Sequence, residues 1–169
     1  MAHGVVRTDD MFNTDVRVGP VSLKYFTGDP AVATEIDNGN VVLLGDLIEG
    51  EYYMYSATTP AANSPKNDIV LVASVEIMYD ERKRALSEFY NAAGRVCRAY
   101  HLHTWDIFSV TKDALDGKEE PAVGDLVELK AGTKLNVVAS ATNGSTQIGK
   151  IIDINVVSGM TFYAIQVNE

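Results

Sequence analysis

Two nearly identical five-residue motifs occur in this chain, Gly45-Asp46-Leu47-Ile48-Glu49 and Gly124-Asp125-Leu126-Val127-Glu128. Glycine reaches positive φ without steric cost and aspartate bonds its own following backbone, so each Gly-Asp pair predicts a tight turn. The apolar residues after each pair predict that a strand follows the turn. The repeat therefore indicates a chain built from small β modules.

Short β-prone runs separated by Gly, Pro and Asn continue along the rest of the sequence. Asn38-Gly39 lies between two such runs and predicts a two-residue hairpin turn. The continuous apolar run at residues 69–73 predicts a strand that is covered on both faces. The regular spacing of turns in the C-terminal part is typical of a small barrel or sandwich. We expect a mainly β protein of small β-barrel or sandwich modules, with one short helix and an extended N-terminal arm.

The helix is expected over residues 80–94, where Asp80 can cap the first turn and Gly94 can end the last. Charged and turn-forming residues concentrate at 113–121, which suggests a linker. These signals divide the chain into an arm at 1–20, a β-rich body at 21–115 that holds the helix, and a small C-terminal β module at 116–169.

Charge and length restrict the classes of partner. The 169 residues include 14 Lys and Arg against 23 Asp and Glu, a formal net charge of −9. Such a chain repels phosphate backbones and anionic lipid surfaces, so we expect neither nucleic acid nor membrane as a partner. No stretch is long and apolar enough for a membrane span, and the N-terminus lacks the pattern of a signal peptide, so synthesis in the cytoplasm is expected.

No complete catalytic set is evident in the sequence, and we expect a protein that is not an enzyme and has no cofactor. It contains no glycine-rich phosphate loop, dinucleotide fingerprint or nucleophile elbow. The lone Cys97 is interpreted as a reduced structural thiol. His101 and His103 alternate on a predicted strand and are weak metal candidates, because alternate residues share a face but no third ligand is evident.

Two groups of residues are candidates for contact with a partner. The polar N-terminal arm carries apolar residues that suit a segment that orders against another protein. Its candidate anchors are Met11, Phe12, Val16 and Val18. Aromatic residues on the β body are interface candidates, or alternatively a platform for sugar rings. These are Tyr52, Tyr53, Tyr55 and Trp105.

The arrangement of the arm, three internal segments and the second Gly-Asp module resembles capsid decoration (cement or head-stabilisation) proteins of tailed bacteriophages and prophages. The segments are Ala85-Leu86-Ser87-Glu88-Phe89-Tyr90-Asn91-Ala92-Ala93-Gly94, Arg98-Ala99-Tyr100-His101-Leu102 and Asp106-Ile107-Phe108-Ser109-Val110.

The resemblance implies a virion structural protein that binds the outer surface of an assembled shell of major capsid protein and stabilises it, with the arm residues in contact with the capsid. Because a lattice presents many sites, a homo-oligomer such as a trimer on the shell is favoured. Two alternatives remain open: a carbohydrate-binding β module, including a virion-borne one, and a small metal-dependent enzyme built on His101 and His103.

Overall fold

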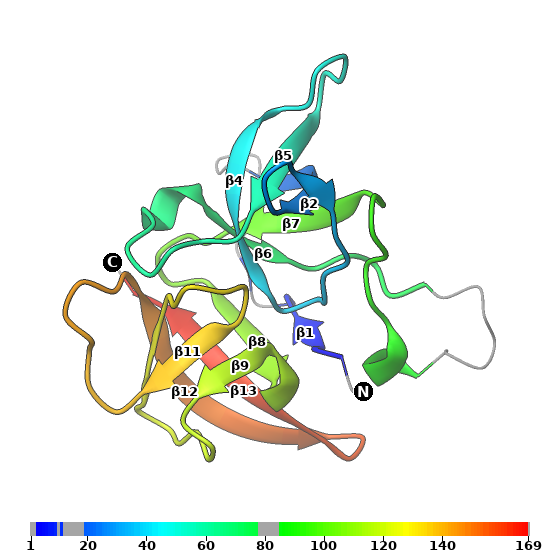
Figure 1. Cartoon of the computed structure of the whole chain (residues 1–169). Helices are drawn as coiled ribbons and strands as arrows, with labels where there is room; N and C mark the ends of the chain where they lie inside the picture. Colours follow the sequence, from blue (N-terminus) through cyan, green and yellow to red (C-terminus); the bar gives the residue numbers. More distant parts are fainter. Residues whose placement is uncertain (1–2, 10, 12–18, 78–84, 169) are drawn as a thin grey trace.

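The computed structural model describes residues 3–9, 11, 19–77 and 85–168, and it confirms a mainly β protein (Figure 1). In these described ranges, thirteen strands form two sheets. Within the described residues the helical content is limited to three short 3-10 turns, η1 (Lys66–Asp68), η3 (Leu86–Glu88) and η4 (Lys112–Ala114).

The first sheet closes into a small barrel. Its strands are β2 (Pro20–Thr27), β3 (Val32–Ala33), β4 (Val41–Leu47), β5 (Met54–Thr58), β6 (Ile69–Val72) and β7 (Cys97–His101), in the order β3-β2-β5-β4-β6-β7. A further antiparallel pairing between β2 and β7 joins the ends, so that β2, β5, β4, β6 and β7 form a closed ring. Closure removes the exposed edges that an open sheet would present.

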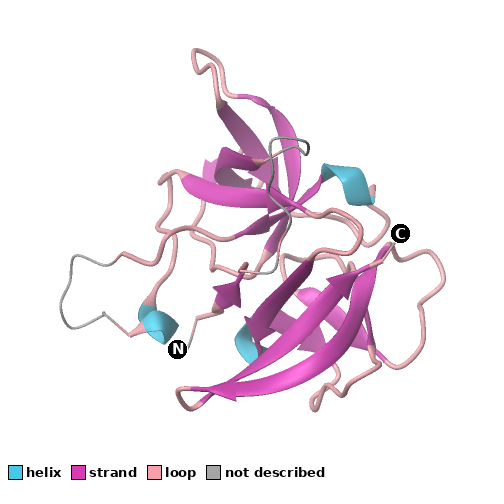
Figure 2. Cartoon of the chain, turned by 180° about the vertical axis from the view of Figure 1, so that it is seen from behind, coloured by secondary structure: helices cyan, strands magenta, loops and turns pink. Residues whose placement is uncertain are grey.

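The second sheet stays open. Its strands are β1 (Val6–Arg7), β8 (Ile107–Thr111), β9 (Leu115–Gly117), β10 (Leu126–Glu128), β11 (Leu135–Val138), β12 (Gln147–Val157) and β13 (Met160–Val167), in the order β1-β8-β13-β12-β10-β11-β9. The β12–β13 ribbon is its longest element (Figure 2). Since β8 and β9 pair with C-terminal strands, the change of sheet falls between His101 and Ile107, ahead of the division expected at residue 115.

Strand β6 belongs to two hydrophobic cores at once. All four of its residues are buried, as the continuous apolar run predicts. Val70 and Val72 pack inside the barrel, whereas Ile69 and Leu71 pack against the second sheet. Because side chains alternate along a strand, one strand can supply both cores. The two sheets therefore form one packed body.

The two copies of the repeated motif adopt different structures. Gly124 has φ +95° in the turn before β10, as expected, and the Asp125 carboxylate accepts the Ala122 N–H at 2.7 Å. Gly45 and Asp46 instead lie within β4, where the pairing register with β5 shifts. A Cβ on Gly45 would lie 2.8 Å from the Ser56 hydroxyl, so close approach of the strands explains this glycine.

The prediction of a helix over residues 80–94 is wrong for residues 85–94, the part that the structure describes. The helical structure in this part is the single 3-10 turn η3. The positions 80–84 lie outside the described residues. Asn91 instead forms an antiparallel bridge with Ile36 through two backbone hydrogen bonds of 2.9 Å. These tertiary hydrogen bonds replace the ones that a helix would supply.

The hairpin expected at Asn38-Gly39 is also wrong. The chain does turn there, with φ +83° at Gly39. However, β4 pairs with β5 and β6, and the residues before the turn pair with β2 and Asn91. Gly39 is needed because a Cβ would lie 2.9 Å from that of Ala114, at the contact between the barrel and the second sheet.

Candidate functional site

The described part of the N-terminal segment packs against the second sheet and is not an extended arm. Strand β1 pairs with β8, and Val5 both accepts from the Thr111 N–H at 3.0 Å and donates its own N–H to the Thr111 hydroxyl at 3.1 Å. Met11 is 9% exposed and lies in the hydrophobic core. Met11 is therefore a core residue and not an exposed contact. Phe12, Val16 and Val18 lie outside the described residues.

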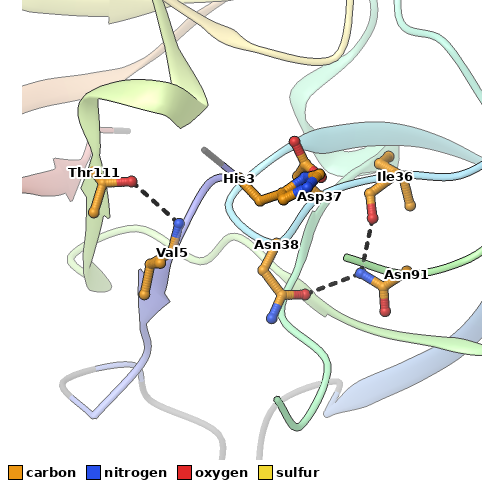
Figure 3. Close-up of polar contacts among 7 residues, drawn as sticks. All are labelled: His3, Val5, Ile36, Asp37, Asn38, Asn91 and Thr111. Carbon is orange, nitrogen blue, oxygen red and sulfur yellow. Dashed lines mark hydrogen bonds and ion pairs between the residues drawn. The ribbon is translucent and has the colours of Figure 1, made fainter. Parts of the chain in front are cut away.

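A polar junction joins this segment to the barrel (Figure 3). The His3 ring Nδ1 lies 2.7 Å from the Asp37 carboxylate, and the ring stacks on Tyr90 at 5.2 Å between centroids. The His3 N–H also donates to the Ser87 carbonyl at 2.9 Å. Each contact ties the chain start to a loop of the barrel, so the junction has a structural role.

Two buried amides lie beside this junction (Figure 3). Asn38 is 0% exposed; its Nδ2 donates to the Ser74 carbonyl at 2.9 Å, and its Oδ1 accepts the Ser74 N–H at 3.0 Å. Asn91 donates from Nδ2 to the Ile36 carbonyl and to the Asn38 Oδ1. This pattern resembles a strand ladder built from side chains. It satisfies buried backbone groups and leaves little capacity for a ligand.

The two histidines lie in different local surroundings. Burial is the largest cause that lowers the pKa of His101, and His103 lowers it further. The strand ends at His101, and the His103 N–H donates to the buried Asp106 carboxylate at 3.0 Å. Across residues 3–9, 11, 19–77 and 85–168, no three His, Cys, Asp or Glu side chains gather to hold a metal ion.

Cys97 is buried in the barrel core, and burial raises the pKa of its thiol to about 11. The nucleophilic form of cysteine is the thiolate, so this thiol, which stays protonated at neutral pH, acts as a packing residue.

Glu128, on β10 of the second sheet, is a buried carboxylate at 1% exposure. It accepts hydrogen bonds from Asn136 Nδ2 at 3.1 Å, the Thr142 N–H at 3.0 Å and Gln147 Nε2 at 2.8 Å. Burial alone would raise the pKa of this carboxyl group, but the hydrogen bonds, led by those of Thr142, lower it. The group therefore stays ionised at neutral pH and is unsuited to proton transfer.

Two of the aromatic candidates project from the tip of the β4–β5 hairpin, which extends beyond the barrel at the top of Figure 1. Tyr52 is 94% exposed and Tyr53 is 68% exposed, while Leu47 beside them is 47% exposed. The tip is closed by the Ile48 N–H bond to the Met54 carbonyl. Tyr55 differs, because it is half-buried and packs against the barrel core.

Trp105 occupies a separate site, in the turn between β7 and β8. Its indole is 60% exposed and borders a groove. The groove is lined by Thr104, Trp105, Lys150, Gln166, Val167 and Asn168. The tyrosines of the hairpin are not part of this lining. The structure thus separates the expected aromatic platform into a projecting hairpin tip and a groove.

Sequence reasoning missed the two buried clusters. Asn91 and Glu128 have apolar neighbours in the sequence, which is a weak signal for a buried polar residue. Asn38 lies in the polar run 37–40, which is typical of an exposed turn and gives no such signal. The turn at Trp105 had a clearer signal, since Asp106 follows His103 at the spacing of a local side-chain cap.

Comparisons with protein-family models, with curated proteins and with solved structures found no match. No helix in the described ranges has the length and apolar character needed to cross a membrane.

Proposed function

We propose that this protein is a capsid decoration protein of a tailed bacteriophage or prophage, which binds the outer surface of the assembled shell and stabilises it. Its partner is the major capsid protein, its location is the virion surface, and its role is structural. The observation that supports this proposal best is the β4–β5 hairpin, whose exposed aromatic tip projects from a rigid closed barrel.

The tip has the composition of a protein contact. Tyrosines supply large contact areas at a low cost in side-chain entropy, and they are enriched among residues that dominate binding energy. Tyr52 and Tyr53 are adjacent and both exposed, so together they offer two aromatic rings to a partner. A monomer in solution gains nothing from two such exposed rings.

The charge around the tip indicates the kind of surface that it fits. Residues 25–65 contain six carboxylates and no lysine or arginine. Three of the six, Asp46, Glu49 and Glu51, are on the hairpin itself. A complementary capsid surface offers arginine or lysine side chains around an apolar depression. Binding through such charges weakens as salt rises.

The N-terminal segment takes a different role from the one expected. Because Val5 and Met11 are buried and β1 pairs with β8 at the edge of the second sheet, this segment is part of the packed body and does not provide the primary contact. Phe12, Val16 and Val18 remain candidates for capsid contact. Removing residues 1–20 would expose core, so such a truncation is a poor test of binding.

A repeated shell also affects affinity. A single hairpin buries less surface than a stable standard-size interface needs. If several copies associate on the shell, for example as a trimer, weak contacts act together at high effective concentration. We therefore extend the proposal to a homo-oligomer that forms on the lattice.

The proposal is tested by mixing the purified protein with undecorated shells of its own virus and sedimenting them. The wild-type protein should co-sediment at saturating stoichiometry and raise the temperature at which shells break. The affinity of the double variant Tyr52→Ser/Tyr53→Ser for the shell should be lower by a factor of about 30 or more, which is the loss expected when a dominant contact is removed.

The matched control is Val156→Ser, which removes an exposed apolar side chain from the β12–β13 ribbon (71% exposed) and should bind as wild type does. Failure of the folded wild-type protein to co-sediment would remove the decoration function. Wild-type binding by the tyrosine variant would remove only the role of the hairpin.

A further inference from the structure

Trp105 has a backbone conformation that its residue type disfavours. Its φ is +74°, and Ser158 is the only other non-glycine residue with positive φ in the described part of the chain. Ser158 is accounted for by the tight turn between β12 and β13, where Gly159 follows with φ +80°. Trp105 is the third residue of a turn closed by the Asp106 N–H and the His103 carbonyl at 3.0 Å. Positive φ at that position ordinarily selects glycine or asparagine.

Hydrogen bonds on both sides hold this turn in place. The Trp105 N–H donates to the Val167 carbonyl at 3.1 Å, and the Val167 N–H donates to the Asp106 carbonyl at 2.9 Å. The Asp106 carboxylate, 0% exposed, accepts the His103 N–H at 3.0 Å. The turn is thus fastened to the end of β13, and the indole is fixed outward on a rigid support. Strained residues that are held this firmly are concentrated at functional sites.

The strand register explains the polar side chains next to the indole. Lys150 on β12 is directly paired with Gln166 on β13, so their side chains are neighbours on one face of the sheet. Asn168 follows Gln166 by two residues and lines the same groove, and Thr104 lines its other side. The groove therefore combines one aromatic face with an ammonium, two amides and a hydroxyl group.

A second depression continues from Thr104. It is lined by Lys66, Asn67, Leu102, His103, Thr104, Thr146 and Gln147. The Lys66 ammonium donates to the Asn168 carbonyl, which links the two depressions. Among the residues that the structure describes, neither lining includes a carboxylate. Together, the two depressions are lined by residues of β12, of β13 and of the turn after β7.

We propose that this groove binds a pyranose ring of a carbohydrate chain, with one face of the sugar on the Trp105 indole and its hydroxyl groups bonded to Gln166, Asn168 and Lys150. The C–H groups on one face of a pyranose give an aromatic ring an apolar surface to cover, while the ring edge needs donors and acceptors. Amide side chains supply both. A hydrophobic peptide would instead leave these amides unpaired, at a cost in binding free energy.

This inference is independent of shell binding. The hairpin tip and the groove share no residue, and the C-terminal end that supports Trp105 lies away from the hairpin in Figures 1 and 2. A decoration protein attached by its hairpin would keep the groove open to solvent.

Trp105 is the only tryptophan of the chain, so its fluorescence reports on this groove alone. We would titrate the full-length protein with pyranose oligosaccharides of glucose, galactose, N-acetylglucosamine and glucuronate type, and with a single-stranded oligothymidylate as the competing class of stacking ligand. The expected result is a saturable change of Trp105 emission with at least one sugar and none with the oligothymidylate.

Variants then show which residues contact the sugar. Their affinities are measured by electrophoresis in gels that contain a polysaccharide of the sugar that binds. Trp105→Asn suits positive φ but removes the ring, and should weaken binding about tenfold or more. Trp105→Tyr keeps an aromatic face and should retain most of the binding, and Gln166→Ala should weaken binding while keeping the indole. The hairpin variant Tyr52→Ser/Tyr53→Ser is the control that should bind as wild type does.

The proposal is overturned if no sugar of the panel changes the emission, or if only the oligothymidylate does. It is equally overturned if Trp105→Asn, shown to be folded by circular dichroism, keeps wild-type affinity. If Trp105→Asn does not fold, Gln166→Ala read by fluorescence decides, and unchanged affinity in that variant excludes the groove.

Discussion

The barrel and the second sheet bury their polar groups in chemically different ways. The barrel relies on two neutral amides, Asn38 and Asn91, which replace missing strand hydrogen bonds. The second sheet buries an ionised carboxylate, Glu128, which accepts hydrogen bonds from two side-chain amides and the Thr142 backbone N–H. Neutral amides do not titrate, whereas a carboxylate with a lowered pKa does. The two halves should therefore respond differently to acid, although they share β6.

Their surfaces differ in a parallel way. The barrel presents a projecting acidic tip with Tyr52 and Tyr53, and the second sheet presents a groove beside Trp105 whose described lining residues include Lys150 and no carboxylate. A projecting tip fits a depression in a large partner, while a groove fits a smaller ligand. The comparison teaches that exposed aromatic residues in one chain can serve separate functions, depending on the backbone that supports them.

The largest expected change in stability follows from removing the side-chain amide of Asn38 in the barrel. Asn38→Ala leaves the Ser74 N–H, the Ser74 carbonyl and an Asn91 donor without their partner. Buried unpaired groups are costly, so we expect the free energy of unfolding to fall by about 3 kcal/mol. Urea denaturation at pH 7 measures this loss.

The control for this variant is Asn155→Ala, since Asn155 is exposed and its side-chain amide donates to the neighbouring Asp153 carboxylate. It should change stability by less than about 0.5 kcal/mol. An equal loss in both variants would contradict the role given to the buried amide.

The carboxylate of the second sheet should give a smaller, acid-dependent effect. Glu128→Gln keeps the shape of the side chain but replaces one acceptor oxygen by an NH₂ donor. Because this NH₂ group would face the donors around Glu128, the free energy of unfolding should fall by about 2 kcal/mol at pH 7. Because the folded pKa of Glu128 lies below the ordinary value of 4.5, its stabilising contribution is present above that value. It is lost as the pH falls through the folded pKa.

The difference between wild type and Glu128→Gln should therefore shrink as the pH falls from 5 to lower values. Thermal unfolding at several pH values measures it. A difference for Glu128→Gln that is constant down to acid pH would show that the carboxylate is not ionised in the folded protein.

The smallest expected effect is at Trp105, and it has the opposite sign. Trp105→Gly relieves the positive φ while the lost indole is mostly exposed, so stability should stay equal or rise by up to about 1 kcal/mol. Urea denaturation checks this. A loss of more than about 1 kcal/mol would identify the indole as a packing residue and would weaken its assignment to a ligand.

Sequence patterns predicted the strands well where periodicity and burial agree. The run 69–73 predicted a strand covered on both faces, and β6 is one. Gly124-Asp125 predicted a turn before a strand, and β10 follows it. In both cases the signal is local, because alternation and turn chemistry act within a few residues.

The errors occur where distant residues decide the structure. The pattern around Asn91 favours a helix, but Ile36 and Asn38 capture its hydrogen-bonding groups from another part of the chain. Asn38-Gly39 forms a turn, but the pairing of its flanks depends on β5 and β6. The candidate tyrosines could be named from the sequence, yet the separation of Tyr52 from Tyr55 in exposure depends on barrel closure.

The most direct test of the account is electron cryomicroscopy of shells saturated with the wild-type protein, at a resolution that identifies individual strands. The account predicts that the β4–β5 hairpin lies against the capsid, with Tyr52 and Tyr53 in contact with basic side chains, and that the groove at Trp105 faces solvent. Density in which the hairpin points away from the capsid while the second sheet lies against it would contradict the account.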